Sequence, residues 1–137
     1  MRKVKTEILH TLAKIAEAND SLSVRFASAI VMNNKIVSVG FNRMKSDPLQ
    51  ARYSKNSEAI YLHAEIHAIK SALRELSVEE LSKTDIYIAR VKRPKRESDT
   101  FVWGLAKPCC GCQRAIREFG IRRVIYTTDE HETYEVM

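Results

Sequence analysis

The sequence of 137 residues has no long apolar run. Its longest apolar stretch, near Phe26 to Met32, is far shorter than the roughly 18 residues that a membrane-spanning helix needs. The basic residues that follow Met1 lead into no apolar segment, so the pattern does not indicate a signal peptide. We therefore expect a cytoplasmic protein that does not enter a membrane.

Cysteine is scarce and crowded. Three cysteines occur, at positions 109, 110 and 112. Disulfides among thiols so close together along the chain are strained, which argues against a secreted domain held together by disulfides. Thiols at this spacing suggest a metal site.

Repeats, low-complexity tracts and interdomain linkers are also absent from the sequence, so we expect one domain over residues 1–137. A content of 45% hydrophobic and 29% charged residues suits a globular chain with a single core. Lys and Arg number 23 against 17 acids, which gives a net charge of +6. This modest excess suits an anionic ligand without requiring one.

Hydrophobic periodicity predicts an alternation of helices and strands. Helical spacing occurs in Lys3–Ala18, Ala59–Leu76 and Cys109–Phe119. Extended patterns occur in Val24–Met32, Lys35–Phe41, Ile86–Val91, Thr100–Leu105 and Ile121–Thr127. The connections are predicted as a long exposed loop over 42–57, a protruding hairpin or loop over 92–99, and a tail or weak edge strand over 128–137. This order favours an α/β sandwich whose strands are covered by helices.

Two short motifs carry the chemistry: His63-Ala64-Glu65 and Pro108-Cys109-Cys110-Gly111-Cys112. Two cysteines three positions apart at a helix start can turn both sulfurs to one side, and a histidine from a neighbouring helix start can complete three ligands for Zn²⁺. The fourth coordination position is left for water. Glu65 is close enough to carry protons to and from a molecule bound there. This is the chemistry of deamination.

The two motifs resemble those of the zinc-dependent cytidine and deoxycytidylate deaminase superfamily. The resemblance runs from about Phe26 to Thr127 and includes Gly40-Phe41-Asn42 and Gly120-Ile121. It implies a three-layer α/β/α sandwich with a mixed sheet of about five strands. The stretch between the two motifs is longer than in compact members, because it contains the basic segment 92–99.

The same resemblance implies roles for individual residues. His63, Cys109 and Cys112 hold the zinc ion, and Glu65 is the catalytic proton carrier. Asn42 contacts the sugar of the substrate, and the backbone of Ala64 contacts the edge of the pyrimidine. The resemblance also implies a homo-oligomer.

Some alternatives stay open at this point. His67 lies one helical turn after His63, so His67 or Cys110 could supply a fourth ligand and close the site. Cys110 is otherwise expected to be a buried, inert thiol. Asn42 could simply close a turn. The basic segment 92–99 is expected to be a solvated hairpin.

The favoured function is the conversion of dCMP to dUMP, because the cations that follow Asn42 could meet a 5′-phosphate. These cations are Arg43, Lys45, Arg52 and Lys55. A rival function is deamination of cytosine or adenine in single-stranded DNA or RNA, which the basic hairpin favours. A third hypothesis, from a different class, is a zinc-stabilised nucleic-acid-binding module without catalysis.

Overall fold

The computed structural model describes residues 3–19, 24–54, 62–95 and 97–137. The helices are α1 (Thr6–Ala18), α2 (Pro48–Tyr53), α3 (Ala64–Ala72), α4 (Val78–Leu81) and α5 (Cys110–Glu118). The strands are β1 (Arg25–Met32), β2 (Lys35–Phe41), β3 (Asp85–Lys92), β4 (Val102–Gly104), β5 (Arg123–Thr127) and β6 (Tyr134–Val136). Within these described ranges, none of the helices has the length and apolar character to cross a membrane.

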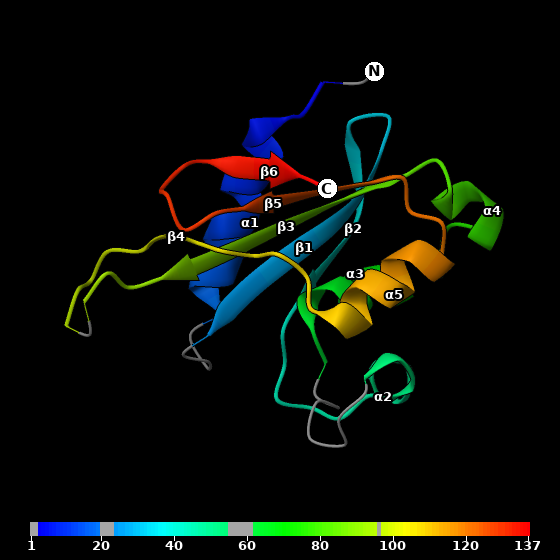
Figure 1. Cartoon of the computed structure of the whole chain (residues 1–137), viewed down its shortest axis with the longest axis horizontal. Coiled ribbons are helices and arrows are strands. Elements are labelled where there is room, and N and C mark those ends of the chain that lie inside the picture. Colours follow the sequence, from blue (N-terminus) through cyan, green and yellow to red (C-terminus); the bar gives the residue numbers. More distant parts are fainter. Residues whose placement is uncertain (1–2, 20–23, 55–61, 96) are drawn as a thin grey trace.

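The strands form one mixed sheet in the order β2-β1-β3-β5-β6. Among the strands that the structure describes, only β3 and β5 run parallel, joined by a crossover that contains α5, and the other pairs are antiparallel. Strand β4 pairs with the last residues of β3, beyond the part of β3 that pairs with β5. The pair β3–β4 forms the hairpin that protrudes from the sheet in Figure 1. The mixed sheet expected from the sequence is confirmed, and the last ten residues do contain an edge strand.

Helices cover both faces of the sheet (Figure 1). Helix α1 buries Leu9, Leu12 and Ala16 against one face, in a core that also contains Tyr87 of β3. Helices α3 and α5 pack on the opposite face, around buried isoleucines of β1 and β3. The three layers match the expected α/β/α arrangement, and the two motifs lie together on the α3 and α5 side.

The region between β2 and α3 differs from the predicted loop. Asp47 accepts hydrogen bonds from the backbone N–H groups of Leu49 and Gln50, and Pro48 occupies the first turn, so a short helix forms there. The helix predicted over 59–76 is α3, which begins at Ala64 and ends at Ala72. Residues 55–57 of the predicted loop and residues 59–61 of the predicted helix lie outside the described residues. Helix α4 was not predicted, although Ser77 and Glu80 form a capping box at its start.

Gly40 allows α3 to lie directly on strand β2. A Cβ atom at Gly40 would lie 2.3 Å from the backbone nitrogen of Ala68 and 2.5 Å from the backbone oxygen of Ala64. Both atoms belong to the helix that carries Glu65. The absence of a side chain at Gly40 therefore sets the distance between this helix and the sheet.

The substitution Gly40→Ala is expected to lower the free energy of unfolding by about 1–3 kcal/mol, because α3 must move away from β2. Denaturant unfolding of the two proteins measures this loss. Gly104→Ala is the matched control, because a Cβ atom there meets flexible side-chain carbons of Arg90 and Lys92 at 3.1–3.3 Å. Equal losses in the two variants would contradict the assigned role of Gly40.

Candidate active site

The N-termini of α3 and α5 bring the two motifs together. His63 is the N-cap residue of α3, and Cys109 is the N-cap residue of α5. Cys112 lies one turn into α5 and is buried. Because the N-terminus of a helix carries partial positive charge, this arrangement favours thiolate ligands.

The three side chains fit a tetrahedral metal ion. Nδ1 of His63 lies 3.7 Å from Sγ of Cys109 and 3.4 Å from Sγ of Cys112. A tetrahedral zinc ion with Zn–S of about 2.3 Å and Zn–N of about 2.0–2.1 Å separates nitrogen from sulfur by about 3.6 Å. All three ligand atoms lie within 4.8 Å of one another. Two sulfurs and one imidazole nitrogen are a donor set typical of zinc.

The thiols of Cys109 and Cys112 shift each other's pKa. Hydrogen bonds with Cys112 and with His63 lower the pKa of Cys109 to about 3. The hydrogen bond with Cys109, together with burial, raises the pKa of Cys112. Both sulfurs must be deprotonated to act as thiolate ligands, so metal binding releases protons.

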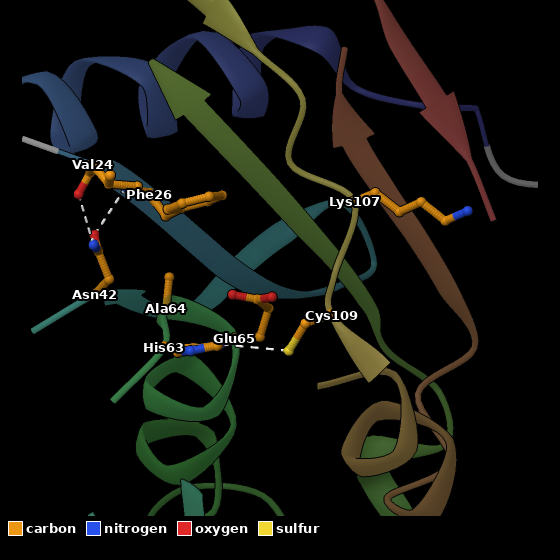
Figure 2. A pocket seen from close by; sticks show the side chains of 8 residues that line it. All are labelled: Val24, Phe26, Asn42, His63, Ala64, Glu65, Lys107 and Cys109. Atoms are coloured by element: carbon orange, nitrogen blue, oxygen red, sulfur yellow. Dashed lines mark hydrogen bonds between the residues drawn. The ribbon is translucent and has the colours of Figure 1, made fainter. Parts of the chain in front are cut away.

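Glu65 is a buried carboxyl group beside these ligands. Its residue is 5% exposed, and burial raises the pKa of its carboxyl group against the opposing charge of His63. In Figure 2 the carboxyl group of Glu65 points into the pocket, on the same side as Cys109. Its position suits a group that takes up and returns protons.

A pocket of about 240 Å³ opens beside two of the candidate ligands, His63 and Cys109. It is lined by Val24, Phe26, Asn42, His63, Ala64, Glu65, Lys107 and Cys109 (Figure 2). Val24, Phe26 and Lys107 were not predicted from the sequence as pocket residues. Lys107 directly precedes the Pro-Cys motif, so its position in the sequence could have indicated it. Phe26 lies within a buried strand, and no sequence signal sets it apart there.

Asn42 and Ala64 both line this pocket, and both form hydrogen bonds with strand β1 or the residue before it. The Asn42 side chain accepts a hydrogen bond from Phe26 N at 2.9 Å and donates one to Val24 O at 2.8 Å. The carbonyl oxygen of Ala64 accepts a hydrogen bond from the Ser28 hydroxyl at 2.7 Å. Its N–H group belongs to the first turn of α3, where backbone donors have no partner within the helix.

The two alternative ligands lie apart from the three-residue cluster. His67 is engaged with β2 instead, because Phe41 N lies 3.1 Å from its Nδ1 and the two rings pack edge to face. Cys110 is exposed at the start of α5, so the prediction of a buried thiol was wrong. Among the residues that the structure describes, the candidate metal cluster contains only His63, Cys109 and Cys112.

Arg43, Lys45 and Arg52, the described cations that follow Asn42, do not line this pocket. Arg43 and Lys45 line a separate cavity of about 300 Å³, together with Lys70 and Arg74. Arg52 lies on α2, and Lys55 lies outside the described residues. Of the described residues that line the ligand pocket, Lys107 is the one lysine or arginine. The expected placement of Arg43 and Lys45 near a substrate phosphate is therefore not supported.

The family model of the cytidine and deoxycytidylate deaminase zinc-binding region matches residues 2–128. The chain belongs to this deaminase family. A search of curated proteins found no significant match. Because the deaminase family model is a zinc-binding region and His63, Cys109 and Cys112 are placed to bind a metal, zinc is the cofactor and the protein is a hydrolytic deaminase.

Solved deaminase structures share the fold. Cytidine deaminase from Burkholderia pseudomallei aligns with a TM-score of 0.61 and 20% identity, over 98% of this chain and 92% of that chain. The dCMP deaminase of the cyanophage S-TIM5 in its apo form gives 0.54 and 20%, over 94% and 89%. Its complex with dCMP and dUMP gives 0.53 and 18%, over 93% and 85%. At these identities the likeness shows the fold.

Proposed function

We propose that this deaminase converts dCMP and water to dUMP and ammonia. The observation that carries the proposal is the shared pocket, in which Glu65 and two of the candidate metal ligands, His63 and Cys109, line one cavity. The phage neighbour with dCMP and dUMP in its structure supports a nucleotide substrate. The apolar walls formed by Val24 and Phe26 suit the faces of a pyrimidine ring.

In the proposed reaction the C4–N bond of cytosine breaks and a C4–O bond forms. His63, Cys109 and Cys112 would hold zinc, which would supply the Lewis-acid chemistry that makes water a competent nucleophile near neutral pH. Glu65 accepts a proton from the attacking water and delivers protons to ring N3 and to the departing amino group. Burial favours this cycle, because it raises the pKa of the carboxyl group above its ordinary value and so helps the group to hold a proton.

Two further residues orient the substrate in this proposal. The N–H group of Ala64 donates to the pyrimidine edge, since the carbonyl oxygen of Ala64 is already bound by Ser28. The hydrogen bonds with Phe26 and Val24 use one amide hydrogen and one acceptor site of Asn42. Asn42 contacts the sugar through the second amide hydrogen and the second oxygen lone pair. Both residues line the pocket, on the side of β1 and α3.

Lys107 is our candidate for recognition of the 5′-phosphate. With the base against Glu65, the phosphate lies toward the rim of the pocket. Lys107 is exposed, and its side chain extends away from His63 and Cys109 (Figure 2). The four-carbon stem of a lysine allows the ammonium group to turn toward a bound anion.

Lys107→Met is expected to lower kcat/KM for dCMP by about 10- to 100-fold, the loss of one charge-assisted hydrogen bond. Turnover of deoxycytidine, which has no phosphate, serves as the internal control and is expected to stay unchanged. Lys35→Met, which removes an exposed lysine at the start of β2, is the matched control for the loss of one positive charge. Equal losses for dCMP and deoxycytidine would remove Lys107 from phosphate recognition.

The experiment that tests the proposed function compares dCMP, CMP, deoxycytidine and cytidine as substrates of the zinc-loaded protein. Ammonia release is measured for each compound. The proposal expects the highest kcat/KM for dCMP. A nucleoside that reacts as well as its monophosphate would contradict the nucleotide assignment while leaving deamination itself intact.

A second candidate substrate is a base in single-stranded DNA or RNA. Cations and aromatic rings are stacked at the base of the protruding hairpin. The Arg90 guanidinium lies 5.4 Å from the ring of Phe26, a pocket residue, and Arg25 and Arg93 lie 4.8 and 5.2 Å from the ring of Phe101. Such surfaces suit a single-stranded polyanion.

A cytosine-bearing oligonucleotide distinguishes this candidate from the first. If the hairpin binds phosphates, deamination of the oligonucleotide weakens steeply with salt, while that of dCMP changes little. The substitution Arg93→Ser should then reduce only the oligonucleotide reaction. No turnover of the oligonucleotide at low salt would exclude the second candidate.

A further inference from the structure

Helix α2 contacts both helices that carry the metal ligands. Its N-cap residue Asp47 pairs with Lys70 of α3 at 2.5 Å. On the other side, Gly111 of α5 packs so closely on α2 that a Cβ atom there would lie 2.9 Å from the Tyr53 carbonyl oxygen. Gly111 lies between the ligands Cys109 and Cys112. Helix α2 therefore links α3 and α5, the two helices from which the zinc ligands come.

Gln50 is the fully buried polar residue of this helix, with 0% exposure. Its side-chain oxygen accepts a hydrogen bond from the backbone N–H of His63 at 3.0 Å. Its side-chain nitrogen donates to the Ser54 hydroxyl at 3.3 Å. A buried amide is stable only when such partners are present, so both ends of this side chain are fixed.

The hydrogen bond from the His63 backbone N–H constrains the backbone of a candidate metal ligand. His63 is the N-cap residue of α3, and its side chain makes no capping hydrogen bond. The orientation of the imidazole therefore depends on its backbone and on its contacts with the two sulfurs. Gln50 holds the nitrogen atom one bond from the Cα of His63, and the Cα–Cβ direction determines where Nδ1 can lie relative to the two sulfurs.

We infer that Gln50 is a positioning residue for the zinc centre, which acts by fixing the backbone of His63 before the metal is bound. The amide oxygen of Gln50 thereby preorganises a three-ligand site whose ligands come from two helices. The inference rests on the zinc centre and not on the choice of substrate. A protein that fails to act on dCMP leaves it standing, whereas the zinc measurements below decide it.

The test is the zinc affinity of Gln50→Met, which keeps the size of the side chain but cannot accept the hydrogen bond. Competition with a chromophoric chelator measures this affinity on the full chain. Loss of a supporting partner of a metal ligand typically weakens metal binding by 10- to 100-fold, and we expect a loss in this range. Gln50→Glu keeps an acceptor oxygen and is expected to restore most of the affinity.

Lys70→Met is the matched control, because it removes the ion pair between α2 and α3 without touching the His63 N–H. Its zinc affinity is expected to stay close to that of the unsubstituted protein. The cobalt(II) absorption spectrum adds a readout of ligand geometry, and we expect it to change in Gln50→Met only. Unchanged affinity in Gln50→Met, or equal losses in the Met variants at positions 50 and 70, would overturn the inference.

A measurement on the unsubstituted protein covers the case in which Gln50→Met does not fold. Hydrogen exchange followed by NMR reports on the backbone N–H of His63. The bond to a buried amide oxygen should protect this N–H strongly from exchange with solvent. Exchange at the rate of an open amide would overturn the inference without any variant.

Discussion

Replacing Glu65 with alanine is expected to abolish measurable ammonia release while the protein keeps one zinc ion per chain. General acid–base groups contribute about 10²- to 10⁴-fold to a rate, and Glu65 is assigned every proton transfer of the proposed reaction. The residues placed to bind the metal are His63, Cys109 and Cys112, so the zinc content should not change. Turnover assays and metal analysis of the same preparation check both expectations.

The isosteric variant Glu65→Gln separates chemistry from packing. An amide fills the same space but cannot carry the proton. Because burial raises the pKa of Glu65 and so disfavours the carboxylate, the neutral amide is expected to leave the free energy of unfolding unchanged or higher. Retained activity in either variant would remove Glu65 from the mechanism.

Replacing Cys112 with serine is expected to eliminate tight zinc binding and to lower the melting temperature. Cys112 is buried at the junction of α3 and α5, and serine keeps its size but is a poor zinc ligand. A ligand present at 1,000 times its Kd stabilises the folded state by about 4 kcal/mol. For a chain of this length, that loss corresponds to roughly 10–15 °C in Tm.

Cys110→Ser is the matched control for this experiment, because Cys110 is an exposed neighbour outside the ligand cluster. It should retain zinc and show the melting temperature of the unsubstituted protein. A chelator should lower the melting temperature of the control but not that of Cys112→Ser. If Cys110→Ser also lost its zinc, the assignment of the three ligands would be wrong.

The sequence predicted the metal cluster because the chemistry is encoded by local spacing. In H-A-E the histidine has extended backbone angles and the glutamate lies in the first turn of the helix, so His63 caps α3 while Glu65 turns into the pocket. The spacing of Cys109 and Cys112 places both sulfurs on one side of α5. The roles assigned to Glu65, Asn42 and Ala64 stay predictions, as does the homo-oligomer.

The contacts of α2 with the metal cluster could not be predicted from the spacing of residues in the sequence. Gln50 meets His63 across 13 positions, and no periodic pattern links a short polar helix to a particular backbone N–H. The start of α2 did carry a signal, since Asp47-Pro48 is typical of an N-cap followed by a first helical residue. The exposure of Cys110 depends on how α5 is oriented on the sheet, which tertiary packing decides.

X-ray absorption spectroscopy at the zinc edge tests the central claim most directly. We expect one zinc ion per chain with two sulfurs at about 2.3 Å, a single imidazole, and one further light atom from solvent at about 2.0 Å. A third sulfur, a second imidazole, or purified protein without zinc under reducing conditions would contradict an open site made by His63, Cys109 and Cys112.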